Sequence, residues 1–311
     1  MITIAMAPME GITTAIYRRI YKRYFEGVDV FYTPFLSLNQ THKFKTREKK
    51  EFLPFQDDLI PQVLTNSAAD YIWAAGVLQE AGYDEININM GCPSKTVVTK
   101  HKGSGMLSDI ERLKRFYDEI YEATEKNGLP AISVKTRIGM EDLSEADEVA
   151  DILASYPFSK VIIHPRLQNE FYGGSPHMEV FEDICGKMRD SGSVAGIIYN
   201  GDLNTTGDVE AFYENHDESM GIMLGRGLLK DPLLPSKIKG LTPPSGRVIN
   251  SFIRDLYDAY ETELSGQRDV LFKMKDVLMY MLMDQPPESK TVKRIKKAKT
   301  KSEMLEAVMQ M

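Results

Sequence analysis

The stretch EININMGCPSK, residues 85–95, has the pattern of a short buried strand that ends in a glycine–proline turn. A helical pattern follows at residues 109–125, and a second apolar strand pattern, AISVKT, follows at residues 131–136. Apolar strands that do not alternate strictly with polar residues are typical of parallel strands covered by helices. This strand–helix–strand unit therefore predicts an α/β fold with a parallel sheet.

The same unit recurs along most of the chain. Eight strand patterns are visible, at residues 2–7, 28–33, 60–65, 85–90, 131–136, 160–164, 195–200 and 221–225. Helical patterns lie between them, at residues 13–24, 67–81, 109–125, 144–155, 177–189 and 207–215. Eight repeats within about 240 residues match the size of a (β/α)8 TIM barrel, whereas a doubly wound open sheet commonly has fewer strands. We predict a TIM barrel over residues 1–240, with loop elements at residues 35–59.

The pattern changes after residue 240. The segment GLTPPSG, residues 240–246, is typical of a turn-rich linker. Beyond it, apolar residues recur at helical spacing, as at Val248, Phe252 and Leu256. We therefore predict a small C-terminal helical bundle over residues 247–311.

Composition indicates an ordinary globular protein, because 42% of the 311 residues are hydrophobic and 27% are charged. No apolar run approaches the roughly 18 residues of a membrane helix, and the N-terminus lacks the pattern of a signal peptide. The two cysteines, Cys92 and Cys185, lie in different contexts, so we expect no disulfide framework and a cytoplasmic location. Nothing in the pattern requires a partner subunit, and we expect a monomer.

The formal net charge of −7 argues mildly against a nucleic-acid partner, but the basic residues are segregated. The segment SKTVKRIKKAKTKS, residues 289–302, contains seven Lys or Arg residues and no acid. A patch of this density can bind phosphates even on an acidic protein. A solvated helix face is the alternative.

Polar or unusual residues follow nearly every predicted strand. In a TIM barrel the chemistry lies at the carboxyl ends of the strands. These ends carry Pro8 and Met9, Thr33 and Pro34, Gln62, Asn89 to Cys92, Lys135 with Arg137, His164 with Arg166, Asn200 to Asp202, and Gly225 with Arg226. Eight converging endings indicate a pocket for a polar, partly anionic ligand.

The last two endings favour a phosphate-bearing cofactor. The turns at residues 200–202 and 225–227 flank the usual phosphate position of such barrels, and glycine lets backbone N–H groups approach phosphate oxygens. Two ordinary turns are the alternative. Lys135 needs an anionic partner, either the N1–C2 edge of a flavin or an acid such as Glu85. Gln62 suits the other polar edge of the ring, and we expect Asn66 to cap a helix.

Cys92 lies in a turn that leaves its thiol at the barrel mouth. A metal site is not expected, because no second cysteine is near and the five histidines are scattered. The absence of a His–acid context also disfavours a protease-like thiolate. A proton donor fits best, since an unperturbed thiol has a pKa of about 8.5. Cys185 lies at an apolar helical position, where we expect it to be buried.

Several motifs resemble, in order and spacing, the signature of bacterial tRNA-dihydrouridine synthases. They are APMEGIT (7–13), PQVLTNSA (61–68), INMGCPSKTV and KGSGML (within 88–107), VKTRIG (134–139), HPR (164–166), NGD (200–202) and GIMLGRG (221–227). The match runs from Ala7 to about Pro232. The segment KMKDVLMY, residues 273–280, is similar to the tRNA-binding helix of the family.

The resemblance implies that NADPH reduces FMN, and that reduced FMN passes a hydride to C6 of a flipped-out D-loop uracil in tRNA. Cys92 would then protonate C5. Asn89 would hold the base, with Lys100, Arg137 and Arg166 towards the RNA or the flavin's periphery. The cofactor would be contacted by Pro8, Met9, Gln62, Lys135, His164, Asn200, Gly201, Asp202, Gly225 and Arg226.

Two departures from the family pattern leave every chemical group in place: Pro165 follows His164, and Gly105-Met106 replaces a more usual alanine-containing sequence. One alternative is an FMN-dependent barrel oxidoreductase that acts on a free pyrimidine, but it has no use for the basic C-terminal segment. The other is a catalytically silent tRNA-binding chaperone, against which the presence of Cys92, Lys135 and Asn89 argues.

Overall fold

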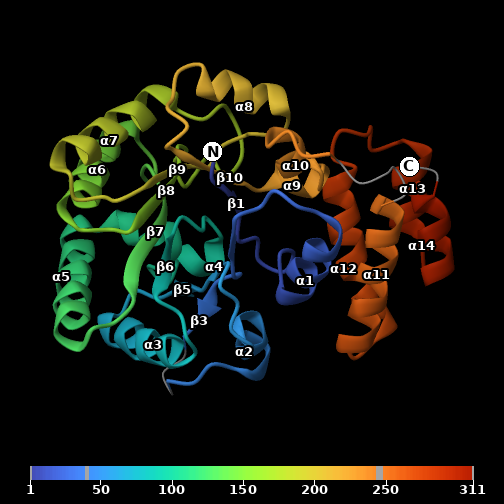
Figure 1. The fold of residues 1–311 in the computed structure, drawn as a ribbon, viewed down its shortest axis with the longest axis horizontal. Coiled ribbons are helices and arrows are strands. Elements are labelled where there is room, and N and C mark those ends of the chain that lie inside the picture. The colour runs from blue at the N-terminus through green and yellow to red at the C-terminus, as the bar shows by residue number, and fades with distance from the viewer. Residues whose placement is uncertain (1, 39–41, 243–247, 310–311) are drawn as a thin grey trace. The chain divides into compact units, whose positions relative to one another are not determined.

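The computed structural model describes residues 2–38, 42–242 and 248–309 (Figure 1). The chain divides into two compact units. The barrel unit comprises Met1–Pro8, Asp29–Asp202 and Asn215–Met223. The helical unit comprises Met9–Val28, Leu203–Glu214 and Leu224–Met311. The predicted boundary near residue 240 stays a prediction, and residues 243–246 of the predicted linker lie outside the described part of the chain.

A single sheet forms the core of the barrel unit. The described residues form ten strands, and the pairs with an assigned register are parallel. The strands are β1 (Ile4–Met6), β2 (Val30–Tyr32), β3 (Leu36–Ser37), β4 (Leu59–Ile60), β5 (Gln62–Leu64), β6 (Glu85–Met90), β7 (Ala131–Arg137), β8 (Lys160–His164), β9 (Ile197–Tyr199) and β10 (Gly221–Leu224). Their order is β3-β5-β6-β7-β8-β9-β10-β1-β2-β4.

The sheet closes on itself through β4 and β5. Only Pro61 separates these two strands. β4 pairs with β2, where Leu59 lies opposite Phe31, and β5 pairs with β6, where Gln62 lies opposite Asn87. Residues 59–64 therefore act as one strand between two neighbours, and the ring has eight strands. The predicted TIM barrel and all eight predicted strands are confirmed, whereas β3 was not predicted.

Small and large apolar side chains from opposite parts of the ring pack together in its core. The buried cluster contains residues of β1, β2, β4, β8, β9 and β10, namely Ala5, Ala7, Tyr32, Ile60, Ile162, Ile198 and Met223. These six strands are neighbours in the sheet order, and their side chains fill the interior. The interior is therefore a packed core, and the chemistry is left to the strand ends.

Helices cover the outside of the strands in the barrel unit (Figure 1). They are α2 (Thr46–Phe52), α3 (Ala68–Glu80), α4 (Lys95–Val98), α5 (Ile110–Asn127), α6 (Ala146–Ser155) and α7 (Met178–Ser191), with the 3-10 turns η1 (Gly103–Ser108) and η2 (Leu143–Glu145). α5 begins at Asp109, whose carboxylate accepts from the N–H of Arg112 at 3.0 Å, and ends at the left-handed Gly128. α2 was expected as loop, because its sequence TREKKEF has almost no apolar periodicity.

The expected helix cap at Asn66 was wrong. Ser67 is the residue that caps α3, because its side chain accepts from the N–H of Asp70 at 3.3 Å. The side-chain amide of Asn66 instead donates to the carbonyl oxygen of Lys100 at 3.0 Å. Asn66 therefore fixes a loop that a neighbouring motif supplies, a contact that local sequence does not reveal.

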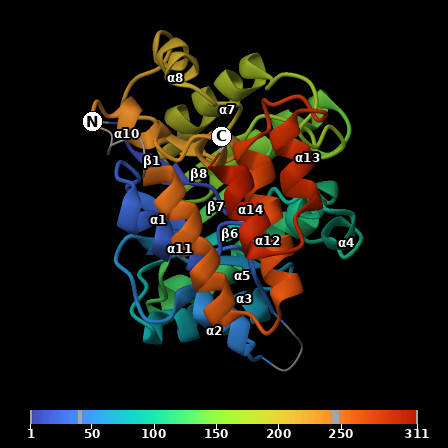
Figure 2. The same ribbon diagram turned by 90° about the vertical axis from the view of Figure 1, so that its right-hand side faces the viewer.

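The helical unit contains eight helices among its described residues: α1 (Ala15–Tyr24), α8 (Thr206–Tyr213), α9 (Arg226–Lys230), α10 (Leu234–Ile238), α11 (Val248–Glu263), α12 (Gln267–Met281), α13 (Lys290–Lys297) and α14 (Lys301–Val308). The last four are the C-terminal helices expected from the sequence, and Figure 2 shows them face on. Phe252 of α11 packs edge-on against Tyr17 of α1 at 5.7 Å. In the described residues, no helix is long and apolar enough to cross a membrane.

Candidate active site

A chain of buried amides crosses the three neighbouring strands β5, β6 and β7, and only Asn89 lies near the carboxyl end of its strand. Gln62 is fully buried, and its Nε2 donates to Oδ1 of Asn87 at 2.8 Å. Its Oε1 accepts from Nδ2 of Asn89 at 2.7 Å, and Nδ2 of Asn87 donates to Oγ of Ser133 at 3.0 Å. Buried amides are costly to leave unpaired, so these bonds fix the orientation of Gln62 and Asn89. Asn87 was not singled out from the sequence, although it shares a strand face with Asn89.

Asn89 also holds the turn that carries the cysteine. Its Oδ1 accepts from the N–H groups of Gly91 and Cys92, at 3.2 and 3.0 Å. The carbonyl oxygen of Cys92 accepts from the N–H and the Oγ of Ser104, at 3.1 and 2.9 Å. The main chain of Cys92 is therefore bound on both sides, while its side chain is half-buried. Ser104 was not predicted to take part.

Two glycines explain why the loop after α4 packs so closely on this turn. Gly103 has a φ of +58°, and a Cβ there would lie 2.8 Å from the carbonyl oxygen of Cys92. A Cβ at Gly105 would lie 2.8 Å from the carbonyl oxygen of Val98. A side chain at Gly103 would push the loop away from the cysteine, and one at Gly105 would push it away from α4. The departure at Gly105 therefore fits the close packing of this chain.

Lys135 lies half-buried on β7, level with Asn89 of β6. Among the described residues, nothing forms a hydrogen bond or ion pair with its Nζ. The expected alternative partner, Glu85, pairs with Lys160 instead. The pKa of Lys135 is lowered to about 7, mainly by burial and to a smaller extent by Arg137, while Cys92 acts in the opposite direction. The amine can therefore accept an anionic or hydrogen-bonding ligand that the chain itself does not supply.

Arg137 joins the cysteine turn to the loop after β8. Its side chain is buried, and Nε donates to the carbonyl oxygen of Gly91 at 3.0 Å. The two terminal nitrogens donate to the carbonyl oxygens of Leu167 and Phe171, at 2.7 and 2.5 Å. Burial lowers the pKa of Arg137 to about 10. The guanidinium thus bridges two loops at the barrel mouth.

Arg166 forms a second buried cluster with His164 and Asp202. Its guanidinium pairs with both carboxylate oxygens of Asp202 and donates to the carbonyl oxygens of Gly173 and Gly174. Nη1 also lies 3.1 Å from Nε2 of His164. A guanidinium has no acceptor, so Nε2 of His164 accepts and its ring proton lies on Nδ1. Asp202 neutralises Arg166 within the cluster.

The predicted phosphate turns belong to different units. In the barrel unit, Nδ2 of Asn200 donates to the carbonyl oxygen of Met223 at 2.8 Å. A Cβ at Gly201 would lie 2.6 Å from the hydroxyl of Tyr199, so a side chain there would require Tyr199 to move. In the helical unit, Gly225 caps α9 and Arg226 begins it.

The two residues at the end of the first strand, Pro8 and Met9, also belong to different units. Pro8 ends a segment of the barrel unit, and Met9 opens the first segment of the helical unit. The N–H of Met9 donates to Oγ1 of Thr13 at 2.8 Å. Nζ of Lys273 on α12 donates to the carbonyl oxygen of Gly11 at 3.0 Å. Within the helical unit, α12 therefore fixes the turn that follows Met9.

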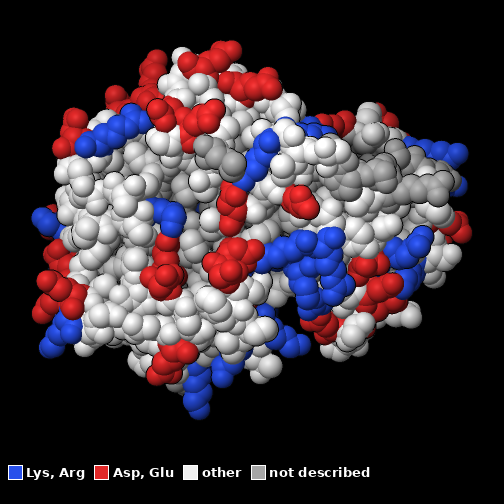
Figure 3. Space-filling view, in the orientation of Figure 1, with Lys and Arg blue, Asp and Glu red and all other residues white. Residues whose placement is uncertain are grey.

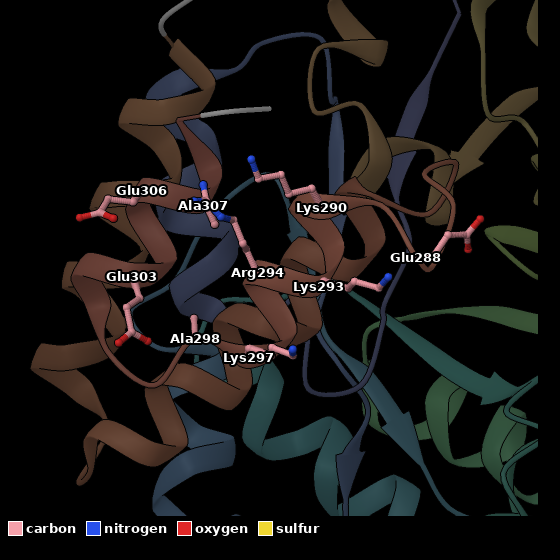
Figure 4. A pocket seen from close by; sticks show the side chains of 9 residues that line it. All are labelled: Glu288, Lys290, Lys293, Arg294, Lys297, Ala298, Glu303, Glu306 and Ala307. Atoms are coloured by element: carbon pink, nitrogen blue, oxygen red, sulfur yellow. The ribbon is translucent and has the colours of Figure 1, made fainter.

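The C-terminal basic segment forms α13 and the residues after it. Val292 and Ile295 are buried, whereas the cations on the other side are exposed. A groove of about 530 Å³ runs along α13 and α14, lined by Lys290, Lys293, Arg294 and Lys297 together with Glu288, Glu303 and Glu306. Figure 4 shows Glu303 and Glu306 pointing away from Lys293 and Lys297. On the face drawn in Figure 3, Lys and Arg side chains gather in a patch near α12.

The family model and the similar sequences agree on one family. The family model for dihydrouridine synthase (Dus) matches residues 5–310. A probable tRNA-dihydrouridine synthase of Staphylococcus epidermidis is 30% identical over 239 residues, which are 73% of this chain and 69% of the relative. The probable tRNA-dihydrouridine synthase 2 of Bacillus subtilis is 27% identical over 266 residues, 83% of this chain and 79% of the relative. A solved 2-naphthoyl-CoA reductase matches 76% of this chain and 50% of its own with a TM-score of 0.52 at 13% identity, a likeness of fold alone.

Proposed function

Because this chain belongs to the dihydrouridine synthase family, we propose that it reduces a D-loop uridine of tRNA to 5,6-dihydrouridine, with FMN as cofactor and NADPH as reductant. The observation that carries the proposal is the Cys92 turn, which Asn89 and Ser104 bind and which lies beside Lys135, a lysine with no hydrogen-bond or ion-pair partner in the described part of the chain. As a member of an enzyme family, the chain is not the catalytically silent RNA-binding protein considered above.

The residues near the strand ends fit a flavin. Lys135 has an amine without an acidic partner, and such an amine would bind the electron-rich N1–C2 edge of the ring. Gln62 and His164 would contact the ring, and Asn200, Gly201 and Asp202 would bind near the phosphate. Pro8, Met9, Gly225 and Arg226 keep the cofactor role that the family resemblance gives them. Once reduced by NADPH, bound FMN would supply the hydride that is added to C6 of the uracil.

Cys92 would donate a proton to C5 of the uracil. Its N–H and its carbonyl oxygen are both hydrogen-bonded, so the main chain that carries the thiol is held in place. Asn89 would bind the base with the N–H that remains after its bond to Gln62. The same amide thus positions the acid and the base that the acid protonates.

The remaining residues that were predicted to bind the substrate differ in their burial. Lys100 is exposed and would bind a phosphate of the RNA. Arg137 and Arg166 are buried, and their guanidinium groups donate to carbonyl oxygens. We therefore propose that they fix the conformation of the loops around the substrate. The predicted C-terminal domain, residues 247–311, would bind the tRNA through the exposed cations of α13.

The test is nucleoside mass spectrometry of unmodified tRNA incubated with the purified protein, FMN and NADPH. The wild-type protein should form dihydrouridine, and Cys92→Ala should form none while still binding FMN, as seen by its yellow colour. The buried Cys185→Ala serves as the control and should retain activity. Free uridine at the same concentration should stay unreduced. Wild-type protein that leaves the tRNA unchanged, or prefers free uridine, would contradict the proposal.

A further inference from the structure

Two neighbouring aromatic residues stand exposed in the loop after β8, in the barrel unit. Phe171 is 47% and Tyr172 is 53% exposed. Phe171 also has a φ of +53°, a left-handed conformation that is rare for a bulky residue. Exposed apolar side chains are common one at a time, but two adjacent rings held out of the core need a physical explanation.

The loop that carries these rings is tied to the cysteine turn. Nε2 of Gln168 donates to the carbonyl oxygen of Pro93 at 3.2 Å. Arg137 bridges the carbonyl oxygen of Gly91 to those of Leu167 and Phe171. The aromatic pair is therefore held beside Cys92 by bonds from two side chains. The rings belong to the rim of the mouth.

The ring of Tyr172 is held in orientation. The guanidinium carbon of Arg137 lies 5.7 Å from its centroid, a cation–π arrangement. The imidazole of His164 lies 6.1 Å away at an interplanar angle of 31°. More than half of the side chain nevertheless faces solvent. A ring that is ordered before binding, and still accessible, is suited to stacking because little conformational entropy is lost on contact.

We propose that Phe171 and Tyr172 form a stacking surface for an unpaired tRNA base adjacent to the uridine that is reduced. The inference rests on the proposed function. A uridine that leaves its stack exposes the faces of its neighbours, and proteins that bind unpaired RNA cover such faces with aromatic side chains. The surface is therefore a substrate contact separate from the acid and the cofactor pocket.

The test compares Tyr172→Ala and Phe171→Asn with the wild type, since asparagine tolerates the left-handed backbone. Each variant should raise KM for tRNA roughly tenfold, within the range found for loss of one stacked base. The rate of NADPH oxidation without tRNA should stay unchanged. Tyr172→Phe, which keeps the ring, should restore KM. The matched control is Phe55→Ala, because Phe55 is exposed to a similar extent, 50%. It packs on Tyr83, which precedes β6, so it lies at the amino end of that strand and not at its carboxyl end, where Cys92 follows.

A direct readout uses tRNA with 2-aminopurine at a position flanking the target uridine. Wild-type protein should change its fluorescence on binding, and Tyr172→Ala should not. An unchanged KM in both variants would overturn the inference, and so would a parallel loss of NADPH oxidation, which would indicate a purely structural role. Wild-type protein that forms no dihydrouridine at all would instead contradict the proposed function.

Discussion

In the proposed function, the Cys92 turn and helix α13 would contact a nucleic acid in two different ways. The turn, residues 89–92, relies on buried, directional hydrogen bonds between amides and main chain. Helix α13 presents exposed cations, and two apolar residues anchor it to its unit. Buried hydrogen bonds fix atoms within a fraction of an ångström and do not depend on salt, whereas exposed charges attract phosphates loosely and are screened. Precision and affinity are thus supplied by different regions.

The largest effect should come from the turn. Asn89→Ala removes the acceptor for the N–H groups of Gly91 and Cys92 and leaves Oε1 of Gln62 without its donor. We expect kcat for dihydrouridine formation to fall roughly 100-fold, because a misplaced acid loses its alignment with the base. Unsatisfied buried groups should also lower the free energy of unfolding by about 1–3 kcal/mol.

The matched control for that variant is Asn127→Ala, whose side chain bonds only within its own helix. Its kcat should equal that of the wild type. If Asn89→Ala kept kcat within a few-fold at every salt concentration, the turn would not be the precise element that the comparison requires.

A smaller effect, of a different kind, should follow from neutralising α13. Changing Lys293, Arg294, Lys296 and Lys297 to Gln should weaken tRNA binding roughly tenfold at low salt, with kcat at saturating tRNA unchanged. The slope of log Kd against log salt should decrease by about 0.7–0.9 for each phosphate contact that is lost. Filter binding across a salt series measures both quantities.

Four exposed cations of the barrel unit serve as the comparison set: Lys49, Lys50, Lys114 and Arg115. Their change to Gln alters the net charge equally. If this set weakened tRNA binding as much as the α13 set, the effect would reflect net charge alone, and α13 would lose its special role.

Alanine substitutions at two glycines test whether close packing against the Cys92 turn affects kcat in addition to the cost of backbone strain. Gly103 and Gly128 have nearly the same φ, +58° and +61°, but only Gly103 lies against Cys92. Alanine at either position should cost about 1–2 kcal/mol through the left-handed backbone. Gly103→Ala should in addition lower kcat several-fold. Equal kcat in the two variants, measured beside thermal unfolding, would contradict the packing argument.

The sequence predicted the strands well and the side-chain partners poorly. All eight strands were visible, because apolar runs of this length are a local signal. α2 was missed because its sequence is charged, and its two buried residues, Glu48 and Phe52, include only one that is apolar. The ring closure at Pro61 depends on pairing with two distant strands, and local sequence contains no sign of it.

The wrongly expected pairing of Lys135 with Glu85 shows why side-chain partners cannot be predicted without the strand register. Glu85 begins β6, whereas Lys135 lies opposite Asn89, four residues further along. At about 3.3 Å per residue the two charges are separated by roughly 13 Å along the strands. Lys160 begins β8 and lies at the same end of the barrel as Glu85, so these two residues pair. The cation near the mouth is thereby left for a ligand.

The smallest expected effect concerns the pH dependence of stability, which should distinguish Lys135 in the barrel mouth from the exposed cations of α13. Burial lowers the pKa of Lys135 from its ordinary 10.5 to about 7. Below pH 7 the lysine is charged in both the folded and the unfolded protein, so the full cost of burying the charge opposes folding. Between pH 7 and 10.5 the unfolded chain binds more protons, and stability rises with pH.

Lys135→Met should therefore raise the melting temperature of the FMN-free protein by roughly 2–4 °C at pH 6, the shift that about 1 kcal/mol gives in larger domains. The gain should shrink as pH approaches 10, because the neutral wild-type amine no longer opposes folding. Lys296→Met, on the exposed face of α13, should give a difference that does not vary with pH. If the rise in melting temperature for Lys135→Met did not depend on pH, the amine of Lys135 would be solvated. The lysine of the barrel mouth would then not differ in burial from the exposed lysines of α13.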